Sequence, residues 1–199
     1  AYSTPLVIEV DGKTQVVAPS AQWICAYNPA NGEEIWRFDH SDGFSVSTRP
    51  IQIDDLIVFS TGYMRSNLVA VRTDGRGDVT ATHEAWRLIR GAPIKPSPIA
   101  IGKHVYVISD SGILSKVDAT DGSLLWQERL SGNFSASPIQ AGDKLYFLSH
   151  EGIVTVVGID DSYRELSKNK LEPRLMASPA VVGEDLLIRS EFALYRIGE

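Results

Sequence analysis

The chain has 199 residues, of which 43% are hydrophobic and 22% are charged, proportions typical of one globular domain with a sizeable core. Its formal net charge is −6 and it has no basic tract, so it lacks the clustered lysines and arginines that bind nucleic acid or an anionic membrane surface. A single cysteine, Cys25, excludes an internal disulfide. No apolar run approaches the roughly 18 residues of a membrane span, which excludes membrane insertion by a helix.

Five proline-containing pairs divide the chain into repeats of similar length. In chain order they are Thr4-Pro5, Arg49-Pro50, Ser97-Pro98, Ser137-Pro138 and Ser178-Pro179. The last three prolines are 40 and 41 residues apart, and the earlier spacings are 45 and 48 residues. A period of this length is typical of repeat architectures, so each pair is expected to begin one structural unit.

Each unit predicts four short strands. A short apolar stretch follows the proline, as at 99–101, and ends at a hairpin turn such as Gly102-Lys103. Apolar runs without alternation come next, and they predict strands that are covered on both faces. These runs are 56–59, 105–108, 145–148 and 186–188. A third strand ends at a turn such as 118–122, and the last strand carries a tryptophan, at Trp36, Trp86 or Trp126.

Four antiparallel strands per unit predict an all-β fold, a β-propeller, because propeller blades stack face to face and cover their middle strands on both sides. A two-layer sandwich would expose one face and alternate more. We expect a single domain over residues 1–199, with blades at about 4–46, 47–95, 96–135 and 136–176 and an incomplete fifth at 177–199. Such a set does not obviously close, and the chain begins abruptly within a repeat. We therefore expect part of a larger ring, with a ring of two copies or an open arc as alternatives.

The turn and tryptophan of two units resemble the pyrroloquinoline quinone-type repeat. In that repeat a strand ends at a turn containing Thr-Gly or Asp-Gly, and a tryptophan follows after three further residues. Residues 26–36 and 118–126 match it closely, and the second unit matches with an enlarged turn at 74–79. The fourth unit departs, because Leu166 stands at the tryptophan position without a preceding Asp-Gly turn. There we expect Leu166 to fill the pocket between blades and leave the outer strand unassigned.

The resemblance implies a scaffold rather than an enzyme. In this family the tryptophan docks between adjacent blades, which gives Trp36, Trp86 and Trp126 a structural role. The quinone-dependent dehydrogenases are longer chains that close about eight blades, hold calcium with Glu, Asn and Asp, and place adjacent cysteines against the quinone. This sequence has no cysteine pair. Other relatives bind no quinone, among them an outer-membrane assembly lipoprotein, and they imply an extracytoplasmic location, periplasmic or in the cell envelope. No signal-peptide pattern occurs in this chain.

We assign no catalytic, cofactor-binding or metal-binding residues, and no cofactor. The four histidines lie one per repeat, in or beside turns, without metal-ligand spacing, and are expected to be solvated. Three serines in the connection at 131–137 are expected to serve the turn and the strand entry rather than a reaction. These residues are His40, His83, His104, His150, Ser131, Ser135 and Ser137.

Two further patterns receive structural interpretations. The acidic pairs Asp54-Asp55 and Asp160-Asp161 lack the Asp-x-Asp-x-Asp-Gly spacing of calcium loops and are expected in hairpin turns. Arg76-Gly77-Asp78 spells a cell-adhesion tripeptide, which we ascribe to chance within a glycine-rich turn.

The leading hypothesis is a non-catalytic binding or scaffold propeller for a protein or small-molecule ligand. The expected partner is a protein or the rest of a larger propeller, with a homodimer as an alternative. Ligand contacts are expected from the irregular connections at 73–83 and 162–176. Two other functions stay open: a fragment of a quinoprotein dehydrogenase, and a sensor or regulatory module of a larger protein.

Overall fold

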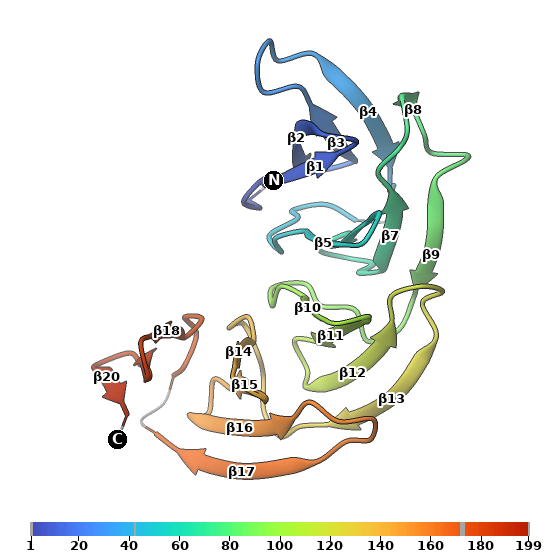
Figure 1. Cartoon of the computed structure of the whole chain (residues 1–199). Helices are drawn as coiled ribbons and strands as arrows, with labels where there is room; N and C mark the ends of the chain where they lie inside the picture. Colours follow the sequence, from blue (N-terminus) through green and yellow to red (C-terminus); the bar gives the residue numbers. More distant parts are fainter. Residues whose placement is uncertain (1, 42, 172–173, 199) are drawn as a thin grey trace.

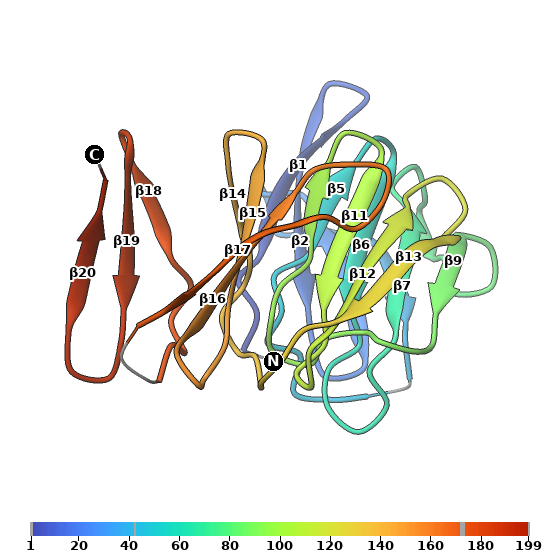
Figure 2. The same ribbon diagram turned by 90° about the horizontal axis from the view of Figure 1, so that it is seen from below.

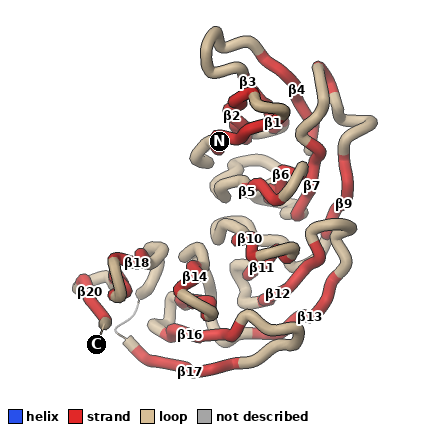
Figure 3. Tube along the Cα trace, viewed as in Figure 1, coloured by secondary structure: helices blue, strands red, loops and turns tan. Residues whose placement is uncertain are grey.

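The computed structural model describes residues 2–41, 43–171 and 174–198, and it consists of strands joined by turns. Five sheets follow one another along an arc, each turned relative to the one before (Figure 1). No helix occurs in the described ranges (Figure 3), so none is present there that could span a membrane. The predicted all-β fold of four-stranded antiparallel sheets is confirmed.

The first two sheets contain the strands up to residue 88. In the order in which they pair, the strands of the first sheet are β1 (Leu6–Val10), β2 (Lys13–Pro19), β3 (Trp23–Tyr27), β4 (Glu34–Asp39) and β8 (Gly77–Asp78). Those of the second sheet are β5 (Ile51–Ile53), β6 (Leu56–Ser60), β7 (Leu68–Arg72) and β9 (Glu84–Leu88).

The remaining three sheets follow in chain order, and the fifth has three strands. The third sheet contains β10 (Ile99–Ile101), β11 (His104–Ile108), β12 (Ile113–Asp118) and β13 (Leu124–Arg129). The fourth contains β14 (Ile139–Ala141), β15 (Lys144–Leu148), β16 (Ile153–Gly158) and β17 (Glu165–Lys170). The fifth contains β18 (Ala180–Val182), β19 (Asp185–Arg189) and β20 (Leu194–Ile197).

Burial follows the predicted pattern. Every residue of β6 is buried, and β7, β11, β12 and β16 are buried at all but their end residues. The first strands of the sheets line the inside of the arc, and β4, β9, β13 and β17 lie on its outside (Figure 1). Figure 2 shows the sheets standing side by side, with the fifth at one end. A separate apolar cluster fills each of the four junctions between neighbouring sheets.

The tryptophans of the repeat lie in these junctions, as the resemblance implied. Trp36 is fully buried between the first and second sheets. Trp86 crosses from the second sheet to the third, where its indole Nε1 donates to the carbonyl oxygen of Ala119 at 2.7 Å. A Cβ on Gly122 would lie 2.8 Å from the Trp86 ring, so the Asp-Gly turn gives the indole its room.

A row of hydrogen bonds also links the strand entries from sheet to sheet. The backbone N–H of Arg49 donates to the Oγ of Ser97, that of Ser97 to the Oγ of Ser137, and that of Ser137 to the Oγ of Ser178, each at 2.9 Å. We call these residues the serine row. Ser137 serves the strand entry as predicted, because its hydroxyl accepts a hydrogen bond from the backbone of Ser97, 40 positions earlier.

The enlarged turn at 73–83 lies on the first sheet. Its strand β8 pairs in parallel with β4, Trp36 opposite Gly77 and Arg37 opposite Asp78. The N–H of Val79 donates to the carbonyl oxygen of Arg37 at 2.9 Å, and the Val79 side chain is buried in the first junction. We call residues 73–83 the strap, because they fasten the second sheet to the outer edge of the first.

The fourth sheet corrects the expectation for Leu166. Its outer strand β17 forms over Glu165–Lys170, with Ser167 in the register that tryptophan occupies in the other sheets. Leu166 is exposed and fills no pocket. Leu171 and Leu175 pack in the junction with the fifth sheet instead. The missing tryptophan is therefore replaced by residues that follow the strand.

Candidate functional site

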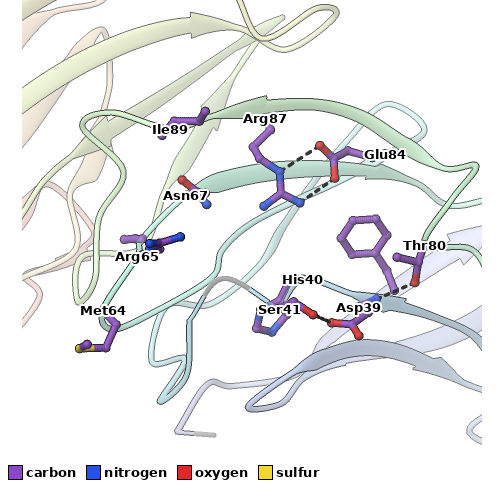
Figure 4. Close-up of a pocket in the computed structure, with 12 residues that line it drawn as sticks. Asp39, His40, Ser41, Met64, Arg65, Asn67, Thr80, Glu84, Arg87 and Ile89 are labelled. Carbon is purple, nitrogen blue, oxygen red and sulfur yellow. Dashed lines mark hydrogen bonds and ion pairs between the residues drawn. The ribbon is translucent and has the colours of Figure 1, made fainter.

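An open cleft of about 930 Å³ lies between the outer parts of the first and second sheets (Figure 4). The end of β4, the turn between β6 and β7, the strap and β9 all contribute side chains to it. They are Phe38, Asp39, His40, Ser41, Met64, Arg65, Ser66, Asn67, Thr80, Glu84, Arg87 and Ile89.

His40 lies at the base of this cleft and corrects the expectation of solvated histidines. It is only 2% exposed, and its ring packs edge-on against Phe59 with centroids 5.8 Å apart. Its Nε2 lies 3.3 Å from the carbonyl oxygen of Ser20. The sequence pattern indicates that His40 lies beside a turn, but it does not show that Phe59 of the second sheet covers the His40 ring.

Asp39 is held as a charged group by its neighbours. Burial alone would raise its pKa, but hydrogen bonds from Ser41 and Gln22 lower it below the ordinary value. The Ser41 hydroxyl donates to Oδ1, and the Gln22 amide donates to Oδ2 at 2.9 Å. Because Asp39 already accepts both bonds as a carboxylate, it stabilises the loop and is poorly suited to take a proton from a substrate.

The rim of the cleft combines exposed apolar side chains with a guanidinium. Met64 is 70% exposed and Ile89 is 71% exposed. The backbone of Met64 has a φ of +80°, a costly conformation for a residue with a side chain. Beside it, Arg65 forms no ion pair with any described residue, whereas Arg87 is held by Glu84 at 2.6 Å. Exposed methionine and arginine are frequent at protein-binding surfaces.

An aromatic pair extends this apolar rim. Phe44 and Tyr63 pack edge to face at 5.6 Å, and their backbones form an isolated β-bridge. Both residues are about half exposed. The pair fixes the loop from which Met64 projects, so the rim is a preformed surface rather than a loose loop.

The structure brings together Ser135 and His150, which the sequence did not connect. The His150 Nε2 and Ser135 Oγ lie 2.8 Å apart, and the N–H of His150 donates to the carbonyl oxygen of Asn133. In the described part of the chain no carboxylate contacts the other ring nitrogen of His150. The pair therefore lacks the orienting acid of a catalytic triad, and it ties the connection at 131–137 to the next turn.

The remaining sequence candidates occupy structural positions. His104 begins β11, and the Nε2 of His83 lies 3.4 Å from Asp74 within the strap. The Gly77-Asp78 part of the adhesion tripeptide is paired in the first sheet. Asp54 lies in a hairpin turn with a φ of +50°. Among the described residues, no three His, Cys, Asp or Glu side chains gather as a metal site would require.

The groove that the structure shows on the inside of the arc has no ligands for the calcium-bound quinone that the repeat is named for. A groove of about 500 Å³ there is lined mainly by prolines and aliphatic side chains, with Arg49 as its charged residue. A calcium-bound quinone needs carboxylate and carbonyl ligands around the metal. No carboxylate lines this groove.

The connection at 162–176 was the other expected ligand contact. Residues 165–170 form β17 on the outside of the arc. Tyr163 packs against Trp126 with ring centroids 5.6 Å apart, so it belongs to the junction of the third and fourth sheets. Residues 172–173 of this connection lie outside the described residues.

Comparison with known proteins gives a family and a fold. A family model described as outer membrane protein assembly factor BamB matches residues 20–191. No curated protein matches the chain. The crystal structure of BamB from Moraxella catarrhalis has a TM-score of 0.74 and 15% identity over 97% of this chain. The computationally designed Ika8 protein has a TM-score of 0.73 and 10% identity over 96% of this chain. This chain covers 57% of each.

Proposed function

Because this chain belongs to the protein family described as outer membrane protein assembly factor BamB, we propose that it is a non-catalytic scaffold that binds a protein partner in the cell envelope. The pyrroloquinoline quinone-type propeller expected from the repeat is thereby confirmed. A designed protein shares the fold, and a fold of this kind carries no function by itself. The proposal therefore depends on the surface of this chain.

The observation that carries the proposal is the cleft between the first two sheets. Its rim presents Met64 and Ile89 to solvent beside the guanidinium of Arg65, on a loop that the Phe44–Tyr63 pair fixes. A partner segment with an apolar anchor and an acidic residue would bury the rim and neutralise the arginine. The polar atoms around Asp39 are already bonded to each other and offer little to a reacting substrate.

The proposal is tested by photo-crosslinking from the rim. A photoreactive residue at position 64 in the purified chain, mixed with an envelope extract, is expected to give one discrete adduct. Arg65→Glu should abolish that adduct, and Lys13→Glu at the start of β2 should leave it unchanged. A probe at Val7, which is exposed on β1, is the matched control. Equal adducts from positions 7 and 64 would count against the cleft.

The dehydrogenase alternative has its own test. Purified chain with calcium and pyrroloquinoline quinone is expected to show no shift of the quinone absorbance and no alcohol-dependent dye reduction. The groove inside the arc lacks carboxylates to hold the metal. Dye reduction that follows added alcohol would overturn the scaffold proposal.

A further inference from the structure

The outer strands of four sheets begin in the same way. In β4, β9, β13 and β17 the pairing with the neighbouring strand shifts by one residue just before the tryptophan register, which is a β-bulge. The residue that opens the bulge is a glutamate in three of these strands, at Glu34, Glu84 and Glu165. In β13 it is Leu124.

Each of the three glutamates forms an ion pair with a cation three residues later. The separations are 3.7 Å from Glu34 to Arg37, 2.6 Å from Glu84 to Arg87, and 2.9 Å from Glu165 to Lys168. In β13 the matching residues are Leu124 and Gln127. The Gln127 amide turns back and donates to the Oγ of Ser115 on β12 at 2.9 Å. The outer edge of β13 therefore carries no such ion pair.

This difference changes what the edge can bind. Charged side chains on an edge strand discourage pairing with another strand, because pairing would strip water from the charges. In β13 the corresponding surface is apolar, with Leu124 46% and Leu125 45% exposed. Within the described ranges β13 pairs with β12 alone. Its free edge thus lacks the ion pair that the three other outer strands share, and its exposed charged residues, Glu128 and Arg129, lie at the other end of the strand.

The first sheet shows how such an edge accepts a strand. There β8 adds to β4 even though β4 carries the ion pair, and Asp78 lies 3.7 Å from Arg37 to balance its charge. The carbonyl of Arg37 and the N–H of Asp39 both point outward, to Val79 and to the hydroxyl of Thr80. Counted from the tryptophan, Gln127 and Arg129 hold the same register in β13.

We propose that β13 binds an extended, uncharged segment of a protein partner by strand addition. The segment forms backbone hydrogen bonds with Gln127 and Arg129 and lays apolar side chains over Leu124 and Leu125. Leu124, Leu125 and Gln127 carry no charge, so an uncharged segment fits this part of β13. In the first sheet, by contrast, Asp78 of the strap balances the charge of Arg37 on β4. This edge belongs to the third sheet and is separate from the cleft, so either proposal stands without the other.

The test transfers the ion pair between strands. The probe is a synthetic peptide of alternating threonine and valine, about ten residues long, with a short lysine tail for solubility. With the unchanged chain, we expect the peptide to shift the amide resonances of β13 and to slow hydrogen exchange at Gln127 and Arg129 by about tenfold or more. L124E/Q127R, which copies β9, should abolish both effects. E165L/K168Q should create them on β17, and Met64→Asp in the cleft should leave them unchanged.

Three results would overturn the proposal. They are no effect of the peptide on β13, equal binding by L124E/Q127R, and protection of β13 that rises with protein concentration without peptide, which would make a second copy the occupant. If L124E/Q127R fails to fold, Gln127→Pro replaces it, since it removes a single outward N–H from an edge strand. Binding that survives Gln127→Pro in a folded chain also contradicts strand addition.

Discussion

Trp86 and Gly122 explain why the repeat joins a tryptophan to an Asp-Gly turn. The two residues belong to neighbouring sheets, and the Trp86 indole lies directly against Gly122. A Cβ on Gly122 would be 2.8 Å from the ring. Gly122 also has a φ of +74°, which suits glycine. The sequence could place both residues in turn and strand, but their contact across a junction comes from the stacking of sheets.

Gly122→Ala is therefore expected to destabilise the chain by about 2–4 kcal/mol, from overpacking against Trp86 together with left-handed backbone strain. The control is Gly102→Ala, with a φ of +58° and no atom within 4 Å of its new Cβ, which should cost about 1 kcal/mol. Urea unfolding of both variants measures the difference. Equal losses would mean that the Trp86 contact contributes nothing.

At the next junction the tryptophan, Trp126, packs against Tyr163 rather than against a glycine. The titration of Tyr163 therefore reports on the packing of that junction. Burial against Trp126, with a hydrogen bond from its hydroxyl to Glu165, raises its pKa from 10.0 to about 12. An unfolded tyrosine loses its proton first as the pH rises. The stability that Tyr163 contributes is thus fully present below pH 10.0 and is lost between pH 10.0 and about 12.

Tyr163→Phe should remove this alkaline loss. The free energy of unfolding of the variant is expected to fall less than that of the unchanged chain as the pH rises from about 9 to about 12, because phenylalanine has no proton to lose. Chemical unfolding at a series of pH values measures both slopes. Parallel slopes would show that Tyr163 titrates in the folded chain as it does in the unfolded one.

At the scale of elements, the strap shows how an irregular connection can be structural. Its enlarged turn predicted ligand contact, and Thr80 does line the cleft. The strap also has a structural role, because β8 joins β4 and Val79 is buried in the first junction. The strands themselves followed from the apolar runs, because a strand covered on both faces needs no alternation. The sequence did not predict that the strap pairs with β4, because β8 has only two residues and no periodic pattern of its own.

Val79→Ala is expected to cost about 2 kcal/mol, because it removes buried methyl groups and leaves a cavity in the first junction. Hydrogen exchange along β4 should quicken as the strap loosens. Val7→Ala on exposed β1 is the matched control, and it should change stability by less than about 0.5 kcal/mol. A strap that merely rests on the surface would give the two variants the same small effect.

At the scale of the whole molecule, the serine row and the four apolar clusters make each sheet depend on its neighbours. Stability in such a stack is close to a sum of terms from successive junctions. The hydroxyl acceptors of the row belong to different junctions, so removing two of them should act independently.

Ser137→Ala is expected to cost about 1 kcal/mol by leaving the N–H of Ser97 without its acceptor. Ser178→Ala should cost less, because that bond is exposed and water can replace it. The double variant should lose the sum of the two within about 0.5 kcal/mol. Thermal and urea unfolding of all three give the comparison, and a much larger loss in the double variant would show coupling through the stack.

The sequence by itself determined the repeating unit, because apolar runs, glycine turns and tryptophans at a period of about 40 residues are local patterns. Only the tertiary structure decided which side chains meet: His40 beneath Phe59, Ser135 beside His150, the strap on β4, and the rim of the cleft around Met64. These contacts join residues on different turns or sheets, and their partners depend on how the sheets stack. For the same reason, the difference between Leu124 and the glutamates of the other outer strands can be seen only when the four strands are compared in register.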